Sequence, residues 1–362
     1  MIISLFFCNI DVDSNKFESY DGVARGGIIF MKKILAILVV ALLVLTGCGA
    51  KDKPETNGGD KGTAEAGKTY NIGTAVYTTE SSVDPGEEDG KFEVNTYYAT
   101  VVMDGDKFVN VYIDAAQNSV KLNAAGELVA FEGKGTKKEL GPDYNMKTYG
   151  NAIAEWFEQI ESLEDWMKGQ TLSEILSMET YEKDEKHPAV PAEEDLKTSV
   201  TIDVSAYLTV VEKAVANAVE VKDVVEVGTA STTSASKDGV EINSTISAVA
   251  LNGNKEIVYT YIDAAQNGAE FSDGKIAPKG IVKSKKELGP DYNMKTFGGA
   301  IAEWDEQIVE LEKYTIGKTV SQVLETPRED GVATEDLKSS VTIGIDGYLE
   351  AIEKAANQTT KL

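Results

Sequence analysis

Histidine and cysteine are nearly absent from this chain of 362 residues, which contains one histidine and two cysteines. A structural zinc site, an iron–sulfur centre or a CxxCH haem attachment needs several of these residues close together, so we predict no metal site. The GxSxG, HExxH and P-loop patterns are also missing, and the chain has no histidine after His187 to act as a base. Hydrolase chemistry is therefore not expected, and any redox function needs an organic cofactor.

Basic residues are scarce relative to acidic ones. The chain has 35 Lys and Arg against 60 Asp and Glu, which gives a net charge of -25. Such a charge repels a phosphate backbone, so nucleic acid is excluded as a partner. A hydrophobic content of 42% is sufficient for a folded core, and the length suits two ordinary domains.

Long apolar runs are confined to one place near the amino terminus. The sequence "MKKILAILVVALLVLTGCGA" begins at Met31, and its apolar run is shorter than the roughly 20 residues that a membrane-spanning helix needs. The stretch Leu45-Thr46-Gly47-Cys48 resembles a lipobox. We therefore expect a signal peptide over residues 31–47 and a lipid on Cys48, which places the chain on the extracellular face of the cytoplasmic membrane. Residues 1–30 fit no signal peptide, so translation is expected to start at Met31.

A duplication dominates the remaining sequence. "YIDAAQN" occurs at Tyr112 and Tyr261, and "KKELGPDYNMKT" occurs at Lys137 and Lys285. After a flexible Gly-, Lys- and Thr-rich linker over residues 48–67, we predict two homologous tandem domains over residues 68–220 and 221–362.

Each copy predicts the same order of elements. Two β-rich runs joined by Asp-Gly-Asp or Asn-Gly-Asn indicate a β-hairpin. An amphipathic helix follows, then a second short helix that starts at a capping box, Thr171 with Glu174 or Thr319 with Gln322. The runs "TSVTI" and "SSVTI" suggest a last strand before a last helix. The predicted fold class is α+β, with an antiparallel sheet and packed helices in each domain. The first amphipathic helix is expected to bury Ile153, Trp156, Ile160, Leu163 and Met167, and its second copy Ile301, Trp304, Ile308 and Leu311.

The end of each copy carries a short hydroxyl-rich motif. It reads Asp195-Leu-Lys-Thr198-Ser199-Val200-Thr201 in the first copy and Asp336-Leu-Lys-Ser339-Ser340-Val341-Thr342 in the second. Together with the hairpin and the central helices, it resembles the terminal D-x-x-[ST]-[SG]-A-T motif of the FMN-binding domains that are flavinylated on threonine. Valine replaces the alanine of that pattern in both copies.

This resemblance implies a cofactor, a function and partners. In the family, a flavin transferase moves FMN from FAD onto the threonine hydroxyl and leaves a phosphodiester, so Thr201 and Thr342 are the expected attachment sites for two covalent FMN groups. Lipobox, linker and tandem domains together look like the flavin lipoproteins of extracellular electron transfer in Gram-positive bacteria. Such a protein is an electron carrier rather than a stand-alone enzyme. Its partners are the transferase, a quinone-linked membrane dehydrogenase as donor, and extracellular acceptors.

The repeated segment "KKELGPDYNMKT" is the second candidate. Gly-Pro-Asp marks a turn, so the residues after it are expected on a loop, where an aromatic ring and a lysine can contact a flavin. The alternative is a structural loop with a buried tyrosine. Trp156 and Trp304 are interpreted as core residues, and Asp114 and Asp263 as strand-end or turn residues. The possible flavin-pocket residues are Tyr144, Asn145, Met146 and Lys147, with Tyr292, Asn293, Met294 and Lys295.

A function of a different class remains open from the sequence. The chain could be a non-redox surface lipoprotein for ligand binding or adhesion, in which the duplicated loops form a ligand pocket. In that case the threonine motifs are polar turns that lead into strands.

Overall fold

The computed structural model describes residues 66–236, 240–280 and 283–362. They belong to one compact unit. The predicted signal peptide, Cys48 and the linker up to residue 65 lie outside the described residues. Within the described part of the chain, no helix combines the length and the hydropathy that crossing a membrane requires.

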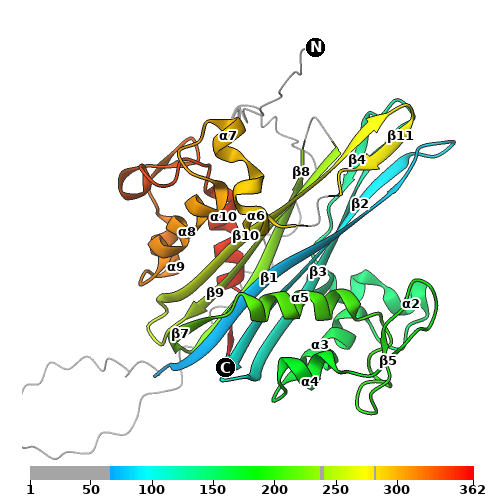
Figure 1. The fold of residues 1–362 in the computed structure, drawn as a ribbon, viewed down its shortest axis with the longest axis horizontal. Helices are drawn as coiled ribbons and strands as arrows, with labels where there is room; N and C mark the ends of the chain where they lie inside the picture. The colour runs from blue at the N-terminus through cyan, green and yellow to red at the C-terminus, as the bar shows by residue number, and fades with distance from the viewer. Residues whose placement is uncertain (1–65, 237–239, 281–282) are drawn as a thin grey trace, which may run out of the picture. The chain divides into compact units, whose positions relative to one another are not determined.

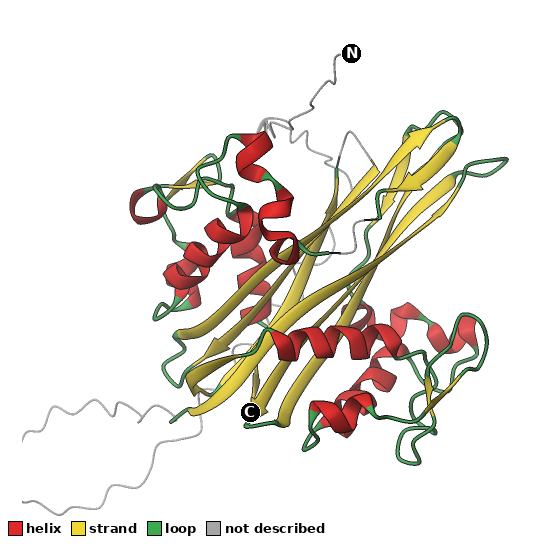
Figure 2. Cartoon of the chain, viewed as in Figure 1, coloured by secondary structure: helices red, strands yellow, loops and turns green. Residues whose placement is uncertain are grey.

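Two five-stranded antiparallel sheets form the centre of the structure, one from each repeat (Figure 2). The first has the order β4-β3-β2-β1-β7 and consists of β1 (Lys68–Val83), β2 (Gly90–Asp104), β3 (Lys107–Leu122), β4 (Leu128–Glu132) and β7 (Val219–Val224). The second has the order β11-β10-β9-β8-β14 and consists of β8 (Glu226–Ala235), β9 (Val240–Leu251), β10 (Ile257–Ser272), β11 (Lys275–Pro278) and β14 (Thr360–Lys361). The two sheets therefore share one topology, and the predicted domain boundary at Glu220 falls inside β7.

The predicted hairpins are confirmed, but each sheet also contains three strands that were not predicted, among them β1 and β8. β2 pairs with β3 across a turn at Gly105, and β9 pairs with β10. The additional strands β1 and β8 are rich in threonine, serine and alanine. Their threonines at positions 74, 78 and 229 are at most 1% exposed. Polar strands of this kind are buried only because the other repeat covers them.

The helices also repeat in order, and the mixture of helices and antiparallel sheets that the sequence predicts is confirmed. Capping boxes start α4 at Thr171 and α9 at Thr319, as predicted. The first repeat contains α1 (Lys137–Leu140), η1 (Gly141–Tyr144), α2 (Met146–Gly150), α3 (Trp156–Met167), α4 (Leu172–Leu176) and α5 (Ser205–Ala216). The second contains α6 (Lys285–Leu288), η2 (Gly289–Tyr292), α7 (Met294–Gly298), α8 (Trp304–Thr315), α9 (Val320–Leu324), η3 (Glu335–Leu337) and α10 (Asp346–Ala356). Two short ribbons complete the fold: β5 (Thr180–Tyr181) with β6 (Val190–Pro191), and β12 (Arg328–Glu329) with β13 (Val332–Ala333).

The sheets pack against each other, and the helices of each repeat cover the outer face of their own sheet (Figure 1). Tyr70 and Ile72 of β1 share one apolar cluster with Tyr259 and Tyr261 of β10. Phe92 of β2 shares another with residues of the second sheet. The two repeats therefore bury one face of each sheet against the other.

Contacts between the repeats come in equivalent pairs. Lys213 on α5 forms an ion pair with Glu287 on α6, and Lys354 on α10 forms the same pair with Glu139 on α1 at 2.6 Å. Thr96 on β2 donates a hydrogen bond of 3.2 Å to the hydroxyl of Ser244, which occupies the equivalent position in the second repeat. Reciprocal contacts of this kind are the signature of a two-fold interface. The chain thus contains, within one polypeptide, the arrangement of a symmetric dimer.

Two equivalent glycines allow the last helix of each repeat to lie close to its sheet. A Cβ atom on Gly73 would stand 1.9 Å from the carbonyl oxygen of Ala214, and one on Gly228 would stand 2.2 Å from that of Ala355. No real contact is that short, and both neighbours are backbone atoms. Only glycine therefore permits this approach of α5 to β1 and of α10 to β8.

Candidate functional site

The segment that carries Thr201 is a turn, and the predicted strands at "TSVTI" and "SSVTI" are wrong. The backbone N–H groups of Ser199 and Val200 both donate to the carbonyl oxygen of Leu196, at 2.8 Å each. This turn directs Leu196 and Val200 into the core beneath α3 and α5, where they are 1% and 0% exposed. Leu337 and Val341 do the same in the second repeat. In a strand, Thr198 and Ser339 would face the core together with these residues, but both are exposed, so the burial pattern is that of a helical turn.

A buried glutamine holds each motif threonine. The backbone N–H of Thr201 donates to Oε1 of Gln159 at 2.8 Å, and its hydroxyl lies 3.4 Å from the same oxygen. Thr342 and Gln307 repeat these contacts at 2.8 and 3.2 Å. Both glutamines are fully buried, whereas Thr201 is partly exposed and Thr342 is exposed. The backbone of the loop is fixed while the hydroxyl group remains accessible.

The same glutamine links the motif to the second predicted segment. Nε2 of Gln159 donates to the carbonyl oxygen of Ala154 at 3.0 Å and lies 3.8 Å from Sδ of Met146. The carboxylate of Glu155 accepts the backbone N–H groups of Met146 at 2.8 Å and Lys147 at 3.3 Å. The structure therefore places Met146 and Thr201 on two sides of one amide group. Gln307, Met294 and Glu303 form the same arrangement in the second repeat.

Large apolar side chains are exposed on this segment in both repeats. Tyr149 is 87% exposed and Ile153 is 53% exposed, and their equivalents Phe297 and Ile301 are 62% and 55% exposed. Ile153 and Ile301 were expected inside the amphipathic helices, and this prediction is wrong because Glu155 and Glu303 cap α3 and α8 one residue before the tryptophan. Exposed apolar residues at equivalent positions beside a fixed loop indicate a surface that another group can cover.

Tyr144 belongs to a hollow next to this loop. Its hydroxyl donates to Oε1 of Gln117 at 3.2 Å, and Nζ of Lys137 lies 4.9 Å from the centre of its ring and 5.4 Å from that of Trp156. The hollow measures about 500 Å³ in the first repeat and about 420 Å³ in the second. In the second repeat, Lys285 lies over Tyr292 and Trp304 in the same way. Thr201 and Thr342 do not line these hollows.

The ammonium group of the lysine in each hollow lies over a tyrosine and a tryptophan ring. Among the described residues, neither Lys137 nor Lys285 forms an ion pair. Burial lowers the pKa of Lys285 from its ordinary value, while Tyr348, Glu241 and Asp263 oppose this shift. An ammonium group over two aromatic rings is stabilised by their faces and keeps its donors free for an anionic or carbonyl-bearing group.

The other predicted site residues have less specific positions. Asn145 and Asn293 adopt left-handed backbone conformations between two short helices, and each side chain donates to a carbonyl oxygen two residues earlier. The predicted flavin-pocket residues of both repeats therefore lie in the short helices η1, α2, η2 and α7 or at the junctions between them, rather than in an irregular loop. The hydroxyls of Ser199 and Ser340 donate to the carbonyl oxygens of Leu196 and Leu337. The remaining members are exposed: Lys147, Lys295, Asp195, Thr198, Asp336 and Ser339.

Asp114 and Asp263 lie in the middle of β3 and β10, so their interpretation as strand-end or turn residues is wrong. Asp114 is fully buried and accepts hydrogen bonds from the hydroxyl of Tyr98 at 3.0 Å and the backbone N–H of Lys138 at 3.1 Å. Burial raises the pKa of Asp114, although hydrogen bonds from the Thr136 side chain and the Lys138 backbone and the charge of Lys138 oppose the shift. Lys138 also reaches the buried carboxylate of Glu164 at 2.6 Å, whose pKa burial raises to about 7. This network joins "YIDAAQN" to "KKELGPDYNMKT", which explains why both segments are repeated.

Several residues of the site were not predicted from the sequence. Gln159 contacts both candidate segments, Glu155 contacts the segment of Met146, and Lys137 and Gln117 line the hollow. The available signal was a third repeated stretch, "AEWFEQI" at Ala154 and "AEWDEQI" at Ala302. Only its tryptophan and isoleucine were interpreted, as core residues, and that prediction is confirmed because both tryptophans are 1% exposed and both isoleucines are fully buried.

Comparison with models of known protein families, with curated proteins and with solved structures gives no match to this chain. Its chemical capacity therefore rests on the site alone. Each repeat offers an accessible hydroxyl group on a fixed loop, exposed apolar side chains beside it, and a lysine in a neighbouring hollow. These groups can accept a covalent substituent on oxygen and can bind an aromatic or anionic group without covalent chemistry.

Proposed function

We propose that this protein is a membrane-tethered flavin lipoprotein made of two homologous tandem domains that carry FMN covalently on Thr201 and Thr342. It acts as an electron carrier, not as a stand-alone enzyme. A quinone-linked membrane system supplies the electrons, and extracellular acceptors receive them. Lipid on Cys48 holds the chain on the extracellular face of the cytoplasmic membrane.

One observation carries the proposal: in both repeats a buried glutamine fixes an accessible threonine beside exposed apolar side chains. A transferase needs to reach the hydroxyl group, and the burial of Val200 and Val341 directs these larger side chains away from the accessible surface. The valine that departs from the family pattern therefore fills the core under the loop and does not cover the hydroxyl.

The residues also fit the chemistry of attachment. A bond forms between Thr201 Oγ1 and the phosphorus of FMN, the pyrophosphate bond of FAD breaks, AMP leaves, and the hydroxyl proton is lost. Oε1 of Gln159, which lies 3.4 Å from Oγ1, fixes the position of the hydroxyl before the reaction. Tyr149 and Ile153 provide an apolar surface for an aromatic ring system, and bound FMN would supply the redox chemistry.

The test is in-gel flavin fluorescence after SDS denaturation, with the protein co-expressed with a flavin transferase. Wild type is expected to fluoresce, Thr201→Ala and Thr342→Ala each to lose about half of the signal, and the double variant to lose all of it. Ser199→Ala and Ser340→Ala are matched controls, because their hydroxyls lie in the same turns but already donate to backbone carbonyls. Both controls are expected to keep full fluorescence.

Two results would contradict the proposal. Covalent flavin on the double variant overturns the attachment sites. The flavin function is overturned if the wild-type protein carries no covalent flavin while the transferase is active on a known substrate. The second result favours a ligand-binding or adhesion lipoprotein, for which the hollows around Lys137 and Lys285 are the binding sites.

A further inference from the structure

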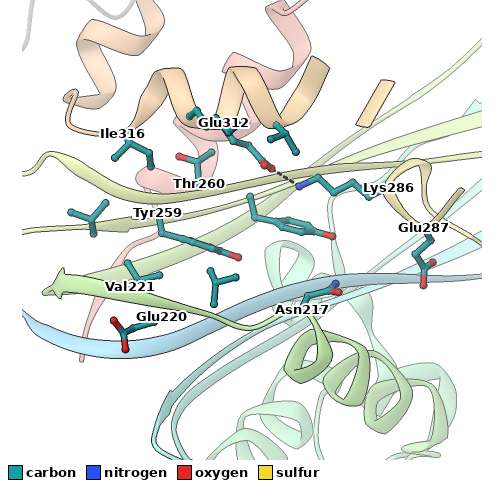
Figure 3. A pocket seen from close by; sticks show the side chains of 14 residues that line it. Asn217, Glu220, Val221, Tyr259, Thr260, Lys286, Glu287, Glu312 and Ile316 are labelled. Atoms are coloured by element: carbon teal, nitrogen blue, oxygen red, sulfur yellow. Dashed lines mark hydrogen bonds and ion pairs between the residues drawn. The ribbon is translucent and has the colours of Figure 1, made fainter. Parts of the chain in front are cut away.

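A third pocket lies where the two repeats meet and contains none of the residues discussed for flavin attachment. It has a volume of about 530 Å³, which is within the range of small-molecule sites. Figure 3 shows its walls: Glu312 of α8 and Ile316, which follows that helix, lie on one side, Val221 and Glu220 of β7 lie on the other, and Tyr259 of β10 lies between them.

The walls of this pocket are apolar, whereas those of its two-fold equivalent are not. Val219 of the first repeat and Val309 and Ile316 of the second line the pocket and are 52%, 37% and 46% exposed. At the equivalent positions around the other pocket, the chain has Thr360, Glu161 and Lys168. The equivalent cavity there, next to Asn110, Tyr112 and Thr360, measures about 60 Å³. Since the repeats arose from one sequence, an exposed apolar wall at only one of two equivalent places points to a ligand rather than to the needs of the fold.

The inner end of the pocket is polar. Lys286 and Glu312 form an ion pair there, shown by the dashed line in Figure 3, and the ammonium group lies 4.0 Å from the centre of the Tyr261 ring. Oε1 of Glu312 also accepts the backbone N–H of Ile262 at 2.6 Å. Among the described residues, no hydrogen bond reaches the second oxygen, Oε2, so this end presents one carboxylate oxygen as an acceptor and an ammonium group as a donor.

The charges around the pocket are balanced. Lys286 pairs with Glu312, Lys313 with Glu310, Glu287 with Lys213 across the repeat interface, and Glu220 with Lys222 at 3.8 Å. A charged ligand would have to break one of these pairs or remain uncompensated. A neutral ligand can use the donor and the acceptor without disturbing them.

We propose that this pocket binds a small neutral molecule with an apolar aromatic body and a hydroxyl head group. The ring lies between the valine and isoleucine side chains and Tyr259, and the hydroxyl donates to Oε2 of Glu312 and accepts from Nζ of Lys286. The site is independent of flavin attachment, since neither Thr201 nor Thr342 takes part in it.

Isothermal titration of the full mature chain with 1-naphthol tests the proposal. One molecule is expected to bind per chain. The variant Val309→Glu/Ile316→Lys, which introduces the residues of the first repeat at these exposed positions, is expected to weaken binding at least tenfold. The matched control Glu161→Val/Lys168→Ile makes the reverse changes in the first repeat and is expected to bind as wild type does. Thermal unfolding of each variant verifies the fold.

Two further probes test the head group. Naphthalene lacks the hydroxyl and 1-naphthoate carries a charge, so both are expected to bind at least tenfold more weakly than 1-naphthol. The proposal is overturned if 1-naphthol does not bind to wild type, if the Val309→Glu/Ile316→Lys variant binds with unchanged affinity, or if 1-naphthoate binds more tightly than 1-naphthol.

Discussion

The valine that replaces alanine in each motif gives the sharpest test of how the site is built. Val200 is fully buried among residues of α3, α5 and the outer face of the first sheet. Val200→Ala removes two methyl groups, and each is worth about 0.8 kcal/mol of transfer free energy. The cavity that remains adds to this cost, so we expect a loss of about 2–3 kcal/mol in the free energy of unfolding.

This loss is measurable by denaturant and thermal unfolding. For a unit of this size, we expect the melting temperature to fall by roughly 4–6 °C. Val341→Ala in the second repeat is the equivalent change, with the same expected effect, because Val341 is also fully buried. Val83→Ala is the control, since Val83 is 60% exposed and its replacement should change stability by less than about 0.5 kcal/mol.

The same variants examine the attachment site. If the valine only fills the core, Val200→Ala and Val341→Ala leave the yield of covalent flavin unchanged at temperatures where they are folded. Unchanged stability would refute the packing argument. A severalfold rise in flavin yield would refute the claim that the valine does not restrict the transferase.

Three further predictions follow from the fold. A separated first repeat, residues 66–224, exposes its inner face with Tyr70 and Ile72, so light scattering is expected to show a homodimer or aggregates; a stable monomer would contradict the shared interface. Gly73→Ala forces a Cβ atom against the Ala214 carbonyl and should cost at least about 3 kcal/mol of unfolding free energy, whereas Gly86→Ala, in open space, should be nearly neutral by denaturant titration. The pKa of Glu164 is raised by burial to about 7 from an ordinary value of 4.5, so the folded state binds the extra proton between these values. Stability should therefore fall by up to about 3 kcal/mol as pH rises through this window, and the fall should be smaller in Glu164→Gln; an equal fall in both proteins would exclude Glu164 as its source.

Local signals in the sequence predicted much of the secondary structure. The Asp-Gly and Asn-Gly turns, the capping boxes at Thr171 and Thr319, and the buried stripe from Trp156 to Met167 all depend on residues close together in the chain. Their geometry is fixed by short-range sterics and backbone hydrogen bonding, so a single sequence suffices.

The motif loop shows where local signals fail. The run "TSVTI" is typical of a strand, but in a strand Thr198 would face the core with Leu196 and Val200, and Thr198 is exposed. Gln159 lies 42 residues before Thr201 in the chain, and nothing in the local sequence indicates that its amide binds this loop. Similarly, Asp114 was predicted at a strand end or turn, whereas hydrogen bonds from groups such as the Tyr98 hydroxyl and the Lys138 backbone stabilise its carboxylate inside the sheet.

The sequence by itself determined the duplication, the order of hairpin and helices, the acidic charge and the two motif threonines. The tertiary structure decided how the repeats meet. Threonines such as Thr74 and Thr229 in β1 and β8 give no clear inward or outward preference, because a hydroxyl group can be hydrated or buried at similar cost when it has a partner. Here the partner is Thr100 of β2, whose hydroxyl lies 2.9 Å from that of Thr74 in the same sheet and 2.7 Å from that of Thr229 across the interface. Thr100 and Thr229 meet only when the two sheets pack together, and this packing creates both the two-fold arrangement and the pocket between the repeats.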